Sequence, residues 1–133
     1  MMRRLEPGMF VSGQITAEEV AELAAAGLTL IVNNRPDGEE PGQPTAAEIA
    51  AAAEAAGIAY RHIPVAGLNA AQVPAMAEAL ASAEGNTLAF CRSGTRSTYL
   101  WALARATQGA DRDMLIGKAA EAGYDLTPIA RFL

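Results

Sequence analysis

Residues 86–97 read NTLAFCRSGTRS. The first five residues form a β-rich run with three apolar side chains in succession, which is typical of a buried strand in a parallel sheet. Cys91 ends this run, a loop containing Gly94 follows, and apolar residues at helical spacing predict a helix from about Arg96. This order places Cys91 at the carboxyl end of a strand, where open α/β sheets hold their sites.

The loop between the predicted strand and helix is suited to hold an anion. Several backbone amides of such a turn can point to one centre, and the helix start adds the positive end of its dipole. Arg96 adds a planar guanidinium that fits an oxyanion. These groups favour the thiolate of Cys91, which is the nucleophilic form of cysteine. We therefore expect Cys91 to be a catalytic nucleophile and Arg96 to bind the anion, with Gly94 permitting close approach of the backbone.

The remaining residues of the loop are candidates for the same anion site. Arg92, Ser93, Thr95 and Ser97 can contribute amides, hydroxyls or a second cation. Each also has a structural alternative, because Arg92 can be solvated and serine or threonine is common at a helix start. For Cys91 the alternative is an inert, buried cysteine at a strand end.

Outward from this loop, short β-rich runs alternate with alanine-rich helical runs. Strands are expected over residues 9–12, 28–33, 58–63 and 86–91. Helices are expected after Thr16, over 45–57, over 71–83, from about 96, and in two short pieces from about 111 and 127. Thr16 and Thr45 each precede a glutamate by three residues, which is capping-box spacing. The order predicts one α/β domain over residues 1–133, with a mostly parallel sheet of four or five strands and helices on both faces.

Composition narrows the class of protein. The 133 residues carry a net charge of −5, which disfavours nucleic acid as a partner. A single cysteine and a single histidine predict no internal disulfide and no metal site, and we expect no cofactor. No apolar run reaches the length of a signal peptide or a membrane span, so a cytoplasmic location without membrane contact is the expectation.

The loop over residues 34–44 follows a second predicted strand and would open at the same edge of the sheet as Cys91. Asp37 is a candidate general acid, or it forms a simple Asp-Gly turn with Gly38. Arg35 could bind a substrate anion at the rim. Asn34 could hydrogen-bond the Cys91 loop from behind.

Three stretches, FVSGQ at 10–14, VNNRPDGE at 32–39 and FCRSGTRS at 90–97, resemble the phosphatase-like domain of β-lactamase-hydrolase-like proteins. The resemblance covers roughly residues 5–125 and implies a fold like that of dual-specificity phosphatases. Members of this family are described as phosphatase-like or as rhodanese-type sulfurtransferases. In some of them the domain is fused to a sulfur dioxygenase, so a separate sulfur dioxygenase is an expected partner. Apart from the resemblance, the alanine-rich helices offer a surface for a homodimeric contact.

Two departures from cysteine phosphatases shape the expected chemistry. Only four residues separate Cys91 from Arg96, where those phosphatases have five, and Phe90 replaces the histidine before the cysteine. The segment 66–69, which matches their general-acid position, carries no carboxylate. The leading expectation is therefore a rhodanese-type sulfurtransferase that takes sulfur from a small anionic donor such as thiosulfate through a Cys91 persulfide. The alternatives are a phosphatase that acts on a phosphoester through a Cys91 phosphocysteine, and an anion-binding module without turnover.

Overall fold

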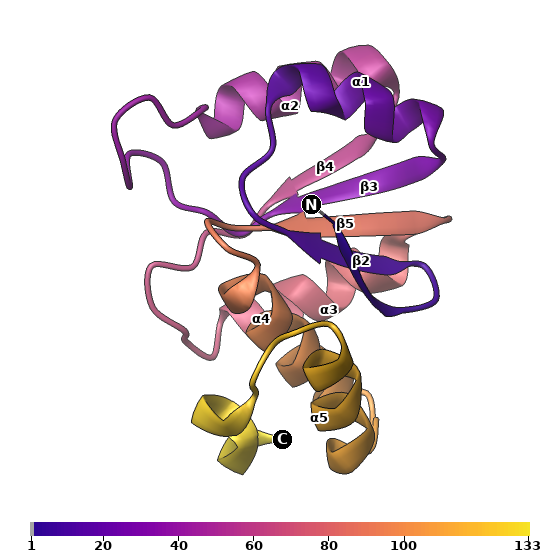
Figure 1. The fold of residues 1–133 in the computed structure, drawn as a ribbon, viewed down its shortest axis with the longest axis vertical. Helices are drawn as coiled ribbons and strands as arrows, with labels where there is room; N and C mark the ends of the chain where they lie inside the picture. Colours follow the sequence, from indigo (N-terminus) through magenta and orange to yellow (C-terminus); the bar gives the residue numbers. More distant parts are fainter. Residues whose placement is uncertain (1) are drawn as a thin grey trace.

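The computed structural model describes residues 2–133, and in them a five-stranded sheet lies between two layers of helices (Figure 1). The strands are β1 (Arg3–Glu6), β2 (Met9–Ser12), β3 (Leu28–Asn33), β4 (Ala59–His62) and β5 (Asn86–Phe90). Their order across the sheet is β1-β2-β5-β3-β4, with β1 antiparallel to β2 and the other pairs parallel. The carboxyl ends of β2, β5, β3 and β4 therefore share one edge, where the loops after these strands meet.

Six helical segments cover the sheet. They are α1 (Ala17–Ala25), α2 (Ala46–Ala56), α3 (Gln72–Ser82), α4 (Thr95–Thr107), α5 (Arg112–Glu121) and the short 3₁₀ helix η1 (Thr127–Phe132), counted over residues 2–133. Helices α1 and α2 lie over one face, whereas α3, α4 and α5 lie over the other (Figure 1). The mostly parallel three-layer α/β fold predicted from the sequence is confirmed.

Alternation along the central strands divides the core into two halves. On β3, Ile31 packs on the α1–α2 side, whereas Leu30 and Val32 pack on the α3–α4–α5 side. On β5, Leu88 packs on the α1–α2 side, like Ile31, whereas Ala89 packs on the α3–α4–α5 side. Strands buried on both faces read as continuous apolar runs, which is why the sequence identifies β3 and β5 so clearly.

The first strand of the sheet, β1, was not expected. It lies at an edge, its first two residues Arg3 and Arg4 are exposed, and only Leu5 enters the core. A short polar edge strand lacks the apolar alternation that identifies a strand in a sequence.

The two predicted helix caps differ. Thr16 and Glu19 form a full capping box at α1. At α2 the Thr45 hydroxyl accepts from the amide of Glu48, but the reciprocal bond from the glutamate is missing, so that prediction of a box was half wrong. The two end helices form as expected, and the second is a 3₁₀ helix. Within residues 2–133, none of the helices combines the length and apolarity needed to cross a bilayer.

Candidate active site

Cys91 directly follows β5, the strand between β2 and β3. Its side chain is buried, and its sulfur accepts a hydrogen bond from the Gly94 amide with a nitrogen–sulfur distance of 3.1 Å. The Cys91 amide donates to Ser12 O at the end of β2. The sulfur thus faces the turn of its own loop.

Gly94 makes the sharp turn into α4 and is the cap residue of that helix. Its φ of +93° is a left-handed conformation that a side chain disfavours. A Cβ placed there would overlap the hydroxyl of Tyr124 and come within 3.3 Å of Ser12 O. The Tyr124 hydroxyl also donates to Ser93 O at 3.0 Å, so the segment after α5 supports the Cys91 loop from outside.

The Arg96 guanidinium is held from two loops, the one between β3 and α2 and the one between β4 and α3. Its Nη1 donates to Glu39 Oε2 at 2.6 Å and to Val65 O at 2.7 Å, and its Nη2 donates to Glu39 Oε1 at 2.8 Å. The bond to Glu39 is the main cause that raises the pKa of Arg96; partial burial opposes it, and attraction to the Cys91 sulfur adds to it. The guanidinium therefore stays charged, and the Cys91 sulfur is among the groups that act on it.

Glu39 and Arg35 form the base of this arrangement. The hydrogen bonds from Arg96 lower the pKa of Glu39 to about 2, although burial opposes the shift and a bond from Arg35 assists it. Arg35 is only 1% exposed, and its three nitrogens donate to Glu39, Glu40 and Gln14. Burial alone would lower the pKa of Arg35, but the bonds to Glu39 and Glu40 outweigh it and raise that pKa. The structure thus places Arg35 beneath the site rather than at its rim.

Asn34 directly follows β3 and bonds to the ends of both neighbouring strands, β5 and β4. Its Oδ1 accepts from the buried Ser97 hydroxyl at 2.8 Å, and its Nδ2 donates to Ile63 O at 2.9 Å. The Asn34 amide also donates to Phe90 O at 2.8 Å. Ser97 therefore uses its hydroxyl to fix the start of α4 to the end of β3, and Asn34 supports the Cys91 loop from behind.

The remaining candidates have contacts that include neither Arg96 nor Glu39. The Asp37 carboxylate accepts from the Ala46 amide at 2.7 Å at the start of α2, so the structure uses this residue to cap a helix. Arg92 is 70% exposed and comes within 3.9 Å of Glu40. The hydroxyls of Ser93 and Thr95 bond each other at 3.1 Å at the surface of the loop.

Two residues that support the site were missed at the level of sequence: Glu39 and Tyr124. Glu39 stands in a carboxylate-bearing loop after β3, and the edge at which parallel strands end was the only available signal for its meeting Arg96. Tyr124 lies 31 residues from Ser93 along the chain, and no local pattern marks it.

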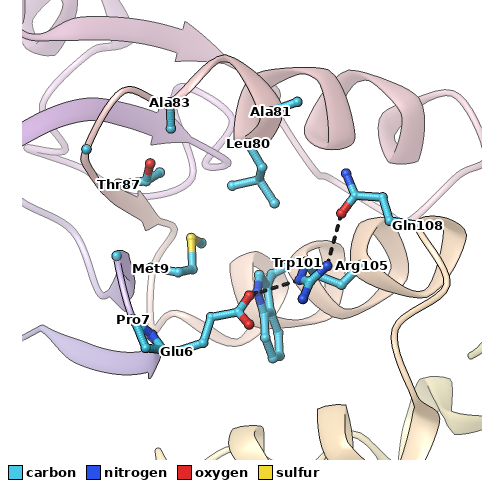
Figure 2. Close-up of a pocket in the computed structure, with 12 residues that line it drawn as sticks. Glu6, Pro7, Met9, Leu80, Ala81, Ala83, Thr87, Trp101, Arg105 and Gln108 are labelled. Carbon is cyan, nitrogen blue, oxygen red and sulfur yellow. Dashed lines mark hydrogen bonds and ion pairs between the residues drawn. The ribbon is translucent and has the colours of Figure 1, made fainter.

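A separate cavity of about 320 Å³ lies at the opposite edge of the sheet, near the starts of β2 and β5 (Figure 2). In its wall, the Glu6 carboxylate accepts from Trp101 Nε1 at 2.8 Å and from Arg105 Nε at 3.0 Å (Figure 2). Lys118 adds a contact at 3.3 Å. Burial opposes ionisation of Glu6, but these bonds outweigh it and lower its pKa. The cluster joins β1 to α4 and α5, which is a structural role.

Comparison with solved structures identifies the type of fold. A crystal structure of a phosphatase candidate from Neisseria meningitidis Z2491 is 33% identical, with a TM-score of 0.83 over 97% of this chain and 93% of that chain. A crystal structure of kinase-associated phosphatase, with its catalytic cysteine replaced by serine, has a TM-score of 0.76 at 16% identity, over 98% of this chain and 89% of that one. The second likeness shows that the fold is that of cysteine phosphatases.

The sequence comparisons identify the family. A beta-lactamase hydrolase-like protein of Xylella fastidiosa (strain Temecula1) is 40% identical over 119 residues, which is 87% of this chain and 28% of that protein. The chain thus spans less than a third of the length of this relative. The family model described as "Beta-lactamase hydrolase-like protein, phosphatase-like domain" matches residues 1–108. The chain belongs to this phosphatase-like domain family, as the resemblance of its motifs implied.

Proposed function

We propose that this chain is a cysteine-dependent phosphatase that hydrolyses phosphate monoesters through a Cys91 phosphocysteine. The observation that carries the proposal is the Arg96 guanidinium, which Glu39 holds through two hydrogen bonds and which the Cys91 sulfur attracts. A nucleophilic thiolate and a guanidinium fork are the two groups that a phosphoryl group needs on one side. The cysteine-phosphatase fold of the solved relatives supports the same chemistry.

The reaction runs in two displacements. In the first, the Cys91 thiolate attacks phosphorus, a sulfur–phosphorus bond forms, and the bond from phosphorus to the ester oxygen breaks, releasing the leaving group as an oxyanion that takes a proton from solvent. In the second, water attacks phosphorus, the sulfur–phosphorus bond breaks, and inorganic phosphate leaves with the thiolate restored. Arg96 and the loop amides bind the phosphoryl oxygens, where negative charge is spread in both transition states.

The carboxylates near the loop point to the class of leaving group. Asp37 caps α2, Glu39 is held ionised by two arginines, and Glu40 is paired with Arg35. A general acid that protonates a leaving oxygen contributes about 10²- to 10⁴-fold in rate. With these three carboxylates engaged, the proposed substrates are monoesters whose leaving group departs readily as an anion, such as aryl phosphates.

The test is hydrolysis of 4-nitrophenyl phosphate by the purified chain and by Cys91→Ser. Because Cys91 is the sole cysteine of the sequence, any covalent adduct on sulfur maps to it. We expect release of phosphate by the wild type, none by Cys91→Ser, and a transient mass increase of one phosphoryl group in rapidly quenched wild-type protein. Hydrolysis that persists in Cys91→Ser would refute the proposal.

Sulfur transfer, the leading expectation from the sequence, gains no support from the family model or the solved relatives. It stays a second candidate because four residues rather than five separate Cys91 from Arg96, and the smaller loop suits a terminal sulfur. A mass increase of one sulfur on Cys91 after exposure to thiosulfate, with sulfite released, would favour it. Tight binding of oxyanions with neither adduct would instead indicate an anion-binding module.

A further inference from the structure

A buried arginine, Arg35, lies behind the proposed site, and each of its three guanidinium nitrogens donates to a neighbouring side chain. Arg35 Nε donates to Glu39 Oε1 at 2.9 Å, Nη2 donates to Glu40 Oε1 at 3.0 Å, and Nη1 donates to Gln14 Oε1 at 3.0 Å. A charged side chain that is 1% exposed is costly unless it is paired and hydrogen-bonded. Because burying Arg35 is costly, we expect this side chain to act through the residues that it contacts, of which Glu39 also bonds to Arg96.

Glu39 carries the effect of Arg35 toward the nucleophile. Its Oε1 accepts from both Arg35 Nε and Arg96 Nη2, at 2.9 and 2.8 Å, and its Oε2 accepts from Arg96 Nη1. One carboxylate therefore bridges two guanidiniums, and with its pKa lowered to about 2 it stays ionised at any neutral pH. Charge-assisted bonds of this kind are short and strongly directional.

The contacts of Arg96 leave one edge of its guanidinium, the edge that carries Nε and Nη2, for an anion. Nη1 uses its two hydrogens on Glu39 and Val65 O, and Nη2 uses one on Glu39. A guanidinium has five N–H donors, so Nε–H and the second Nη2–H remain. These two point in parallel from one edge and match two oxygens of an oxyanion. Glu39 thus holds Arg96 from the end and does not compete for that edge.

We infer that Arg35 is a positioning residue that sets the orientation of the Arg96 fork through Glu39. The inference rests on the proposed function for the identity of the anion as a phosphoryl group, but it applies to any oxyanion bound at the Cys91 loop. Arg35 touches neither substrate nor sulfur in this scheme. It fixes the carboxylate that fixes the catalytic guanidinium.

The variants that test the inference are Glu39→Gln and Arg35→Lys, with Glu40→Gln as the matched control. Glu40 also pairs with Arg35, but its contacts do not include Arg96. We expect kcat/KM for 4-nitrophenyl phosphate to fall about 10- to 100-fold in Glu39→Gln and Arg35→Lys, the range that loss of a charged hydrogen bond implies, and less than about threefold in Glu40→Gln. If Arg35→Lys does not fold, Arg35→Gln replaces it, because a glutamine keeps a hydrogen-bond donor toward Glu39 without the charge. A rise in activity in Glu39→Gln would overturn the inference, because it would make Glu39 a plug of the anion site.

A double-mutant cycle separates positioning from general structural support. In the Arg96→Lys background the fork is already gone, so Glu39→Gln should cost less than about twofold more if it acts through Arg96. An equal loss in both backgrounds would show a merely structural role and overturn the inference.

Calorimetric titration with tungstate separates this inference from the proposed function. Weaker tungstate binding in Glu39→Gln and Arg35→Lys, without hydrolysis by the wild type, would refute the phosphatase proposal and support the positioning role. Unchanged tungstate binding in both variants would overturn the positioning role even if the wild type hydrolyses the ester. A folded wild type that binds no tungstate would overturn both.

Discussion

Replacement of Gly94 by alanine tests the geometry of the Cys91 loop directly. The left-handed backbone at φ +93° costs a residue with a Cβ about 1–2 kcal/mol. The new methyl group would also overlap the Tyr124 hydroxyl, so the ring must move and lose its bond to Ser93 O, which adds about 0.5–1.5 kcal/mol. We expect Gly94→Ala to lower the free energy of unfolding by about 1.5–3.5 kcal/mol.

Gly57 provides the matched control. It has φ +75° at the end of α2, and a Cβ there would meet nothing within 4 Å. Gly57→Ala should therefore cost only the backbone strain of about 1–2 kcal/mol and leave hydrolysis unchanged. Gly94→Ala should also lower kcat/KM about tenfold, because the Gly94 amide that donates to the Cys91 sulfur is displaced.

Urea denaturation of both variants gives the two free energies, and steady-state hydrolysis of 4-nitrophenyl phosphate gives the activities. Equal destabilisation by the two substitutions would refute the assigned contact between Gly94 and Tyr124. Full activity in Gly94→Ala would refute the role of the Gly94 amide at the sulfur.

Further substitutions and conditions test other parts of the site. Ser97→Ala removes a buried donor to Asn34 Oδ1 and should lower the free energy of unfolding in urea by about 1–3 kcal/mol; a loss below about 0.5 kcal/mol would contradict the buried contact. The folded pKa of Glu39, about 2, lies below the ordinary 4.5, so its ion pairs stabilise the fold fully above about pH 4.5 and are lost as the pH falls through about 2. The stability difference between wild type and Glu39→Gln should therefore shrink over that acid range, and a gap that stays constant would count against the shared ion pair with Arg96. Across a series of aryl phosphates, kcat/KM should fall steeply as the leaving phenol becomes less acidic, whereas a flat dependence would reveal a general acid.

The parts of the fold that the sequence predicts are those whose signals are local. The apolar runs of β3 and β5, the cap at Thr16 and the turn at Gly94 all depend on neighbouring residues, and the structure has them at the expected places. Strand β1 was not predicted, because a polar edge strand exposes most of its side chains and lacks an apolar pattern.

The site is harder to predict because its bonds join distant segments. Arg96 meets Glu39 across 57 residues, and no spacing rule states which carboxylate of the 35–40 loop will reach it. Asp37 looked like the candidate acid from its position after a strand, yet its carboxylate caps the Ala46 amide. The motif also does not determine the reaction. A loop with four residues between cysteine and arginine suggested sulfur transfer, whereas the family and the solved relatives are phosphatase-like.

The contact of Tyr124 with the Cys91 loop affects the choice of a C-terminal boundary when this domain is expressed or aligned with relatives. The family match ends at residue 108, before α5, yet Tyr124 braces Ser93 and Gly94, and Leu115 and Ile129 fill the same core as α4. The functional unit therefore extends past the stretch that defines the family. A fragment trimmed to that stretch would keep Cys91 and Arg96 but lose the tyrosine that packs against the turn between them.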